Sequence, residues 1–135
     1  MSTGMLAKAR DKLPAPVRLL QGRLERLPID EGSFDAVTCF NALHFSDAPQ
    51  AALGEFHRVL APHGRLVIVD WRRDWFMMPL LDKWLRMNRR PMGRLLGTRE
   101  LATLAGNAGF DLDAVERFRI RPAWALMTLR AHRTG

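Results

Sequence analysis

The chain has one cysteine and no long apolar run. With Cys39 alone among 135 residues, no intramolecular disulfide can form, and we expect a protein of the reducing cytoplasm. Cys39 lies in an apolar stretch with strand character, which favours an inert, packed thiol over a reactive one. The longest apolar runs, such as 66–69, fall far short of the roughly 20 residues that cross a bilayer, so we expect no membrane partner.

Several catalytic and binding motifs are also missing. No two glycines form G-x-G, and no glycine-rich phosphate loop is present. The four histidines, one cysteine and 14 acidic residues show no metal-ligand spacing, and no Ser-His-Asp arrangement is visible. We therefore predict no metal site, and any chemistry has to come from scattered polar side chains.

Lysine is scarce, so the formal charge of +7 is carried almost wholly by arginine. The densest basic stretch covers 72–99 and contains Trp75 and Trp84, with Trp71 just before it. Basic residues interleaved with aromatic ones are found at nucleic-acid and anionic membrane surfaces, but also on solvated helices. No finger, helix-turn-helix or RNA-recognition signature accompanies the charge. Nucleic-acid association is therefore kept as a second alternative.

Hydrophobic periodicity and turn residues predict helices and strands in alternation. Pro49 suits the first turn of a helix capped by Asp47 or Ser46, and Thr98 suits the cap of another. The predicted helices cover 3–13, a segment from Pro49 to Leu60, 75–92 and 99–108. The predicted strands cover 17–21, 34–40, 65–71, 113–120 and 124–132, and the last two form an antiparallel hairpin.

This order predicts the fold class. It is an α/β, partial Rossmann-like fold with a mostly parallel sheet, helices on both faces and a C-terminal antiparallel hairpin. A chain of 135 residues fits one domain, and no linker is long enough to divide it, so we assign 1–135 to a single domain.

The ordered motifs resemble class I S-adenosylmethionine-dependent methyltransferases, close to the type-11 small-molecule branch. The likeness rests on their order and spacing over almost the whole chain. The fragments are MLAKARDKL (5–13), VRLLQG (17–22), LERLPI (24–29), SFDAV (33–37), NALHF (41–45), EFHRVLAPHGRLVIVDW (55–71) and TRELATLAGNAGF (98–110).

The resemblance also implies what is missing. In that family a glycine-rich loop and an acidic residue on the second strand hold the cofactor, and both belong upstream of Met5. We therefore expect a domain truncated at its amino terminus relative to the family. Arg23 stands where the family has an aspartate for the adenine amino group, and arginine cannot accept a hydrogen bond. Two lost charge-assisted contacts cost about 3–6 kcal/mol, so we expect weak cofactor binding.

The resemblance assigns site residues at the carboxyl ends of the strands, where ligands bind in open α/β sheets. His44, in a loop after a strand, is the catalytic candidate, as a general base. The substrate side holds Asp70, Trp71 and Trp75, although Asp70 equally suits a cap and a Met and Trp stripe from Trp75 is more typical of core. The residues assigned to the cofactor are Arg23 and Leu24 at the adenine and Cys39, Phe40 and Asn41 at the methionine part.

In the family's strand order, the absent strands lie between 17–21 and 34–40. An unpaired strand edge favours association, so we expect a homodimer formed by strand-edge pairing or exchange. The sequence thus predicts an S-adenosylmethionine-dependent methyltransferase-like protein acting on a small-molecule acceptor, weak or inactive as an isolated chain. The first alternative is a non-catalytic remnant that serves as an oligomerisation or protein-interaction module.

Overall fold

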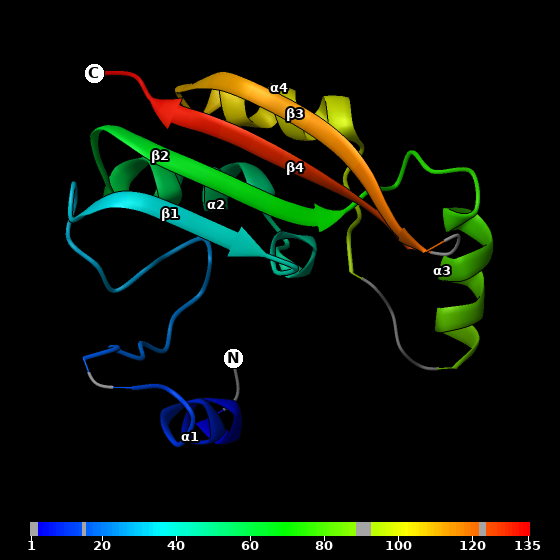
Figure 1. Ribbon diagram of the computed structural model, residues 1–135, viewed down its shortest axis with the longest axis horizontal. Helices are drawn as coiled ribbons and strands as arrows, with labels where there is room; N and C mark the ends of the chain where they lie inside the picture. Colours follow the sequence, from blue (N-terminus) through cyan, green and yellow to red (C-terminus); the bar gives the residue numbers. More distant parts are fainter. Residues whose placement is uncertain (1–2, 15, 89–92, 122–123) are drawn as a thin grey trace.

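The computed structural model describes residues 3–14, 16–88, 93–121 and 124–135, and Figure 1 shows one four-stranded sheet with helices beside it. The helices are α1 (Thr3–Arg10), the 3-10 turn η1 (Leu43–Phe45), α2 (Pro49–Val59), α3 (Met78–Met87) and α4 (Thr98–Asn107). The strands are β1 (Phe34–Phe40), β2 (Leu60–Trp71), β3 (Phe110–Arg121) and β4 (Trp124–Arg133).

The strand order is β1-β2-β4-β3. β1 and β2 pair in parallel, whereas β4 is antiparallel to both β2 and β3. Three strands therefore run in one direction and β4 alone runs in the other, as the arrows in Figure 1 show. The predicted α/β class, the mostly parallel sheet and the C-terminal hairpin are confirmed.

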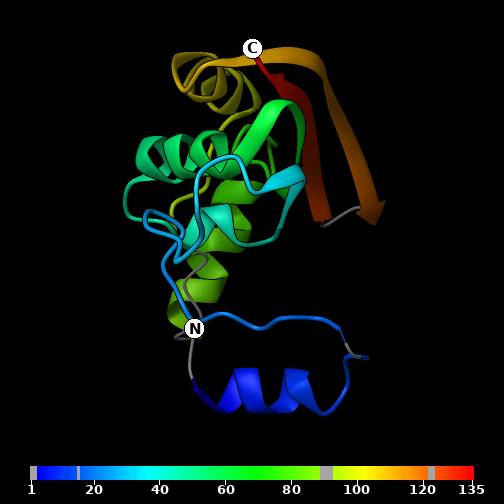
Figure 2. The same cartoon turned by 90° about the vertical axis from the view of Figure 1, so that its left-hand side faces the viewer.

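The main core lies between the sheet and two helices. Leu66 and Ile68 of β2 are fully buried against Leu53 of α2 and Leu101 of α4, and Phe56 completes the packing. Side chains alternate between the two faces of a strand, so one face of β2 carries these residues. We expected helices on both faces; Figure 2 shows α2 and α4 on the same face and, in the described part of the chain, no helix against the other.

β1 has the predicted bounds, and its side chains alternate. Cys39 is buried and Val37 packs on the core, whereas Phe34 and Phe40 are exposed. Apolar residues at successive positions favour a strand with both faces covered. In the described chain only one face of β1 is covered by helices, which explains the two exposed phenylalanines.

The start of α2 differs in detail from the prediction. Pro49 does occupy the first turn, but the N-cap is Ala48, not Asp47 or Ser46. The Ser46 hydroxyl accepts a hydrogen bond from the Ala48 N–H at 3.2 Å and donates one to the Glu25 carboxylate at 2.5 Å. The Ser46 side chain, which the local pattern assigned to the helix cap, is therefore hydrogen-bonded to Glu25, a residue distant in the sequence.

Other elements also differ from the sequence prediction. Segment 17–21 forms no strand, because a strand needs a neighbour to pair with; the N–H of Val17 instead bonds locally to Pro14 O at 3.1 Å. α3 begins at Met78, three residues later than expected, and Thr98 is the first residue of α4 and not its cap. The Thr98 hydroxyl donates to Asp74 at 2.8 Å, so this side chain too has a distant partner.

Among the described residues, no helix has both the length and the apolar character that a bilayer crossing requires.

Candidate functional site

His44 and Asp70, predicted separately, form one buried pair. Because β1 and β2 are parallel neighbours, the loop after β1 and the end of β2 meet at the same edge of the sheet. His44 Nδ1 lies 2.6 Å from Asp70 Oδ1, and the His44 backbone N–H donates to Asp70 Oδ2 at 3.1 Å. The Trp71 N–H adds a third bond to the Asp70 carboxylate at 2.7 Å. With Nδ1–H donating, Nε2 of the neutral imidazole is the nitrogen that can accept a proton.

Asn41 turns the chain from β1 into the loop that carries His44. Its φ of 46° is left-handed, a conformation that asparagine tolerates better than most residues. The Asn41 N–H donates to Val69 O at 2.8 Å, which ties this turn to β2. Leu43 is buried in the main core and anchors η1 beneath His44. The position of the imidazole is thus set by backbone contacts on both sides.

Segment 93–97 closes the far side of this loop. The Arg94 N–H donates to His44 O at 2.8 Å. A Cβ on Gly93 would collide with the same oxygen, and the φ of Gly93 is +69°, so only glycine fits there without strain. The Phe45 ring, itself exposed, lies on the His44 ring with a centroid separation of 4.0 Å.

The residues assigned to the cofactor lie along the outer edge of β1. Leu24, Cys39 and Phe40 line one cavity of about 410 Å³. Arg23 and Leu24 line an adjoining cavity of about 670 Å³. The structure therefore brings Leu24, Cys39 and Phe40 together, whereas Asn41 lies at the turn above them and lines neither cavity.

Cys39 has an environment that disfavours a thiolate. It is 5% exposed, and burial raises the pKa of the Cys39 thiol to about 11, with the Asp70 carboxylate adding to the effect. A thiol is a nucleophile only as the thiolate. This arrangement agrees with the predicted inert, packed role.

Arg23 is engaged with acidic neighbours. Its guanidinium lies 3.4 Å from Glu25 and 3.6 Å from Asp47, and its side chain is mostly exposed. Glu25 also accepts the Ser46 hydroxyl, and this hydrogen bond is the main reason that the pKa of Glu25 is lowered. The sequence pattern did not single out Glu25; its one signal was its position two residues after Arg23.

The apolar cavity fits one part of S-adenosylmethionine better than the other. Its lining offers apolar contact for the adenine and the methionine chain, with Thr38 and Cys39 as its polar side chains. The described residues that line it include no carboxylate for the ribose hydroxyls and no charged group for the amino-acid end. The described lining of this cavity therefore supplies an apolar wall and not a complete cofactor cradle.

The predicted substrate residues have different environments. Asp70 is 2% exposed and paired with His44. Trp75 is 5% exposed and lies with Met78, Leu95 and Ala125 in a second buried cluster, against which Trp71 packs. Trp75 thus lies in a core environment, as the pattern of Met and Trp residues that begins at Trp75 also suggested.

In the described part of the chain, no three His, Cys, Asp or Glu side chains gather in a group that could hold a metal ion.

Comparison with known proteins places the chain in a family. Residues 1–68 match the family model Methyltransf_11, described as a methyltransferase domain. The demethylmenaquinone methyltransferase of Thermus thermophilus is 48% identical over 71 residues, which cover 50% of this chain and 32% of that protein. An uncharacterized 37.1 kDa protein in transposon TN4556 of Streptomyces fradiae is 33% identical over 123 residues, 84% of this chain and 35% of that protein.

A solved structure agrees with these matches. The crystal structure of an S-adenosylmethionine-dependent methyltransferase from Thermotoga maritima, a possible histamine N-methyltransferase, superposes with a TM-score of 0.83 at 25% identity. The match covers 98% of this chain and 70% of that one, whereas the chain spans about a third of the length of the curated relatives above. The matched half of the chain, the strand order and this likeness agree: the chain belongs to the class I S-adenosylmethionine-dependent methyltransferase family, whose cofactor is S-adenosylmethionine.

Proposed function

We propose that this chain takes part in methyl transfer from S-adenosylmethionine to a hydroxyl of a small-molecule acceptor, with His44 as general base. The observation that carries the proposal is the contact between His44 and Asp70 at the carboxyl edge of the parallel pair β1 and β2. Ligands of open α/β sheets bind at this edge. The Thermus relative, named for demethylmenaquinone, supports a small-molecule acceptor.

The roles of the two side chains follow from their hydrogen bonds. S-adenosylmethionine, when bound, supplies the methyl group. The acceptor hydroxyl loses its proton to His44 Nε2, because Nδ1 is engaged by Asp70. The imidazolium that forms is stabilised by the Asp70 carboxylate, which also fixes the ring orientation through the His44 backbone N–H. Asp70, Trp71 and Phe45 are proposed to face the acceptor side, with Phe45 offering an exposed apolar ring.

We further propose that Leu24, Cys39 and Phe40 contact the apolar part of the cofactor, with Arg23 and Asn41 at its rim. The cavity that Leu24, Cys39 and Phe40 line supplies no carboxylate to the ribose, so binding by this chain alone is weak. Each missing charge-assisted bond lowers affinity by about tenfold or more. Activity of the isolated chain is accordingly low.

Methyl transfer is tested with a fluorescent or radiolabelled assay of a hydroxylated aromatic acceptor, and cofactor binding with calorimetry. A rate that falls at least about tenfold in His44→Gln supports the role of His44. His57→Gln is the control, since His57 packs against Phe110. The absence of a heat change at millimolar S-adenosylmethionine or S-adenosylhomocysteine would contradict catalysis by this chain on its own.

The alternative, a non-catalytic interaction module, is favoured by the outer edge of β1. In the described part of the chain β1 pairs with β2 alone, and Phe34 and Phe40 at its two ends are 44% and 61% exposed. An open strand edge is a template for a further strand. We propose a homodimer formed along this edge, and light scattering that finds only monomer at high concentration would contradict it. Nucleic-acid association and a cytoplasmic location stay predictions.

A further inference from the structure

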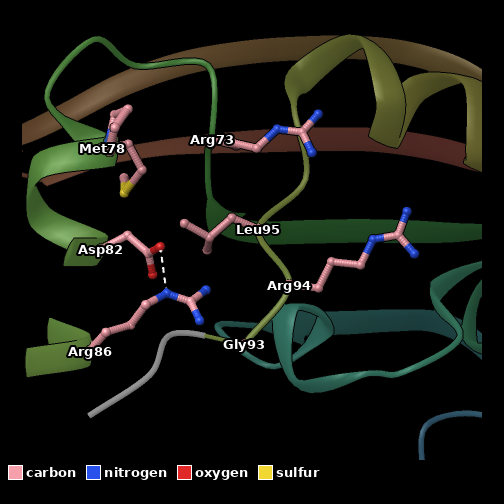
Figure 3. Close-up of a pocket in the computed structure, with 8 residues that line it drawn as sticks. Arg73, Met78, Asp82, Arg86, Gly93, Arg94 and Leu95 are labelled. Carbon is pink, nitrogen blue, oxygen red and sulfur yellow. Dashed lines mark hydrogen bonds and ion pairs between the residues drawn. The ribbon is translucent and has the colours of Figure 1, made fainter. Parts of the chain in front are cut away.

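A third cavity, beside the His44 loop, combines an apolar floor with three arginine side chains. It has a volume of about 340 Å³ and lies between α3 and segment 93–95 (Figure 3). The lining includes the apolar side chains of Met78, Pro79 and Leu95. The charged side chains at the cavity are Arg73, Asp82, Arg86 and Arg94. A cavity of this size suits a small organic molecule.

The charges around the cavity do not cancel. Arg86 Nε donates to Asp82 at 2.8 Å, as the dashed line in Figure 3 marks. Arg73 and Arg94 share one carboxylate, that of Glu100, at 2.9 and 3.0 Å. Among the described residues named here, three guanidinium groups therefore meet two carboxylates, which leaves an excess of positive charge. Each guanidinium uses one nitrogen in these bonds and keeps further N–H donors, for which no acceptor appears among the described residues.

The floor of the cavity is held by buried packing. Met78 is 1% exposed and Leu95 is 8% exposed, and both belong to the buried cluster with Trp75 and Ala125. The Arg73 N–H donates to Leu96 O at 2.9 Å, which joins the end of β2 to segment 93–97. Preorganised walls lower the ordering cost of binding.

The cavity is joined to the proposed catalytic loop. Arg94, whose side chain lines the cavity, donates its backbone N–H to His44 O at 2.8 Å. Gly93 lies against the same carbonyl. A molecule in the cavity therefore lies next to the loop that positions His44.

We propose that this cavity binds a small aromatic acid, with the ring on Pro79 and Leu95 and the carboxylate on Arg86, because the guanidinium groups of Arg73 and Arg94 turn away from Arg86 (Figure 3) and bond to Glu100. The planar guanidinium fork matches a carboxylate. That this acid is the methyl acceptor rests on the proposed function; that the cavity binds it does not. The acceptor class is then a hydroxylated aromatic acid.

The test is a titration of the full chain with benzoate, followed by NMR and calorimetry, with benzamide as the uncharged probe. Benzoate is expected to bind at least about tenfold more tightly than benzamide. Arg86→Gln is expected to weaken benzoate binding about fivefold to tenfold. Arg94→Gln is expected to weaken it less, because the Arg94 guanidinium bonds to Glu100 and adds only to the positive charge near the cavity. Asp82→Asn should do the opposite and tighten it, because it frees Arg86 from its ion pair.

Arg130→Gln is the matched control. Arg130 is 54% exposed, comparable to the cavity arginines, and pairs with Glu116 on the hairpin. Its substitution should leave benzoate binding unchanged. Circular dichroism checks that each variant folds. If an arginine variant does not fold, the tighter benzoate binding expected of Asp82→Asn still tests the proposal. Equal affinity for benzoate and benzamide, or no effect of any cavity substitution, would overturn the proposal.

A further variant separates this inference from the proposed function. His44→Gln should bind benzoate like the unmodified chain, because the cavity lining does not include His44. Benzoate binding without any methyl transfer would contradict the catalytic proposal and support the cavity. Methyl transfer that is indifferent to Arg86 and Arg94 would support catalysis and contradict the acidic acceptor. Inorganic phosphate binding as tightly as benzoate would show a general anion site and overturn the aromatic acid.

Discussion

His44 and Asp70 are 26 residues apart in the sequence, and their side chains meet at 2.6 Å in the interior of the protein. The Asp70 carboxylate accepts three hydrogen bonds, two from His44 and one from the Trp71 N–H. Buried polar groups are costly when they lose their partners. This pair therefore sets both the shape of the loop after β1 and the direction of the imidazole.

Asp70→Asn is expected to lower the free energy of unfolding by about 1–3 kcal/mol. The introduced amide keeps one acceptor oxygen, but its NH₂ group then faces a donor. Urea unfolding at pH 7 measures the loss. Asp113→Asn is the control, because Asp113 bonds to His132 at the surface and is 50% exposed. An equal, small change in both variants would mean that the buried pair adds little to stability.

Gly93→Ala is expected to destabilise the fold by about 1–3 kcal/mol, since a left-handed alanine is strained. Its Cβ would also collide with His44 O. Gly54→Ala in α2 is the matched substitution: nothing lies within 4 Å of its Cβ, and alanine stabilises a helix by roughly 0.5–1 kcal/mol. Thermal unfolding should move in opposite directions for the two variants. A stabilised Gly93→Ala protein would contradict the close approach at His44.

Glu55 is expected to contribute to stability that is lost in acid. Its carboxylate accepts bonds from Arg58 at 2.8 and 2.9 Å, the main cause that lowers the pKa of Glu55 to about 2, and from the Leu27 N–H at 2.9 Å. A carboxyl group whose pKa is lower in the folded state stabilises the fold above the unfolded pKa, near 4.5. That contribution declines as the pH falls from about 4.5 to 2.

The check is urea unfolding between pH 5 and about 2. Glu55→Gln should be less stable at pH 5 and should lose less stability on acidification than the unmodified chain. Glu116→Gln, at a side chain that is 61% exposed, should follow the unmodified chain. Parallel curves for Glu55→Gln and the unmodified chain would contradict the role of the Arg58 pair.

Cys39 is expected to resist alkylation in the folded protein. The thiol is buried and its pKa is about 11, so the thiolate fraction at pH 8 is about a thousandth. Iodoacetamide labelling followed by mass spectrometry should be slow without urea and rapid in concentrated urea. Rapid labelling of the native protein would mean that the cavity along β1 opens to solvent.

Local patterns were sufficient for much of the secondary structure. The run 34–40 became β1 with the same bounds, and Pro49 begins α2, because apolar runs and proline act through the backbone of a few neighbouring residues. The cap predictions at Ser46 and Thr98 were wrong because these hydroxyls found partners far along the chain, Glu25 and Asp74. Segment 17–21 had the composition of a strand but has no strand beside it to pair with in the described structure.

The candidate site, too, could be predicted only in part from the sequence. His44 and Asp70 could be singled out because each follows or ends a predicted strand, and the family motifs could be recognised from their order along the chain. Their contact depended on the parallel register of β1 with β2, which pairs Phe40 with Val69 and so brings the two strand ends together. The cavity between α3 and segment 93–95 is likewise lined by separate segments of the chain, and no short sequence pattern predicts that they lie together.

Composition and periodicity thus decided the type of each element, because those preferences arise within a few residues. The tertiary structure decided which strand ends share an edge, which hydroxyls bond to distant residues and not to a helix N-terminus, and which arginines line one cavity. These outcomes depend on strand register and side-chain packing over distances that the local sequence does not encode.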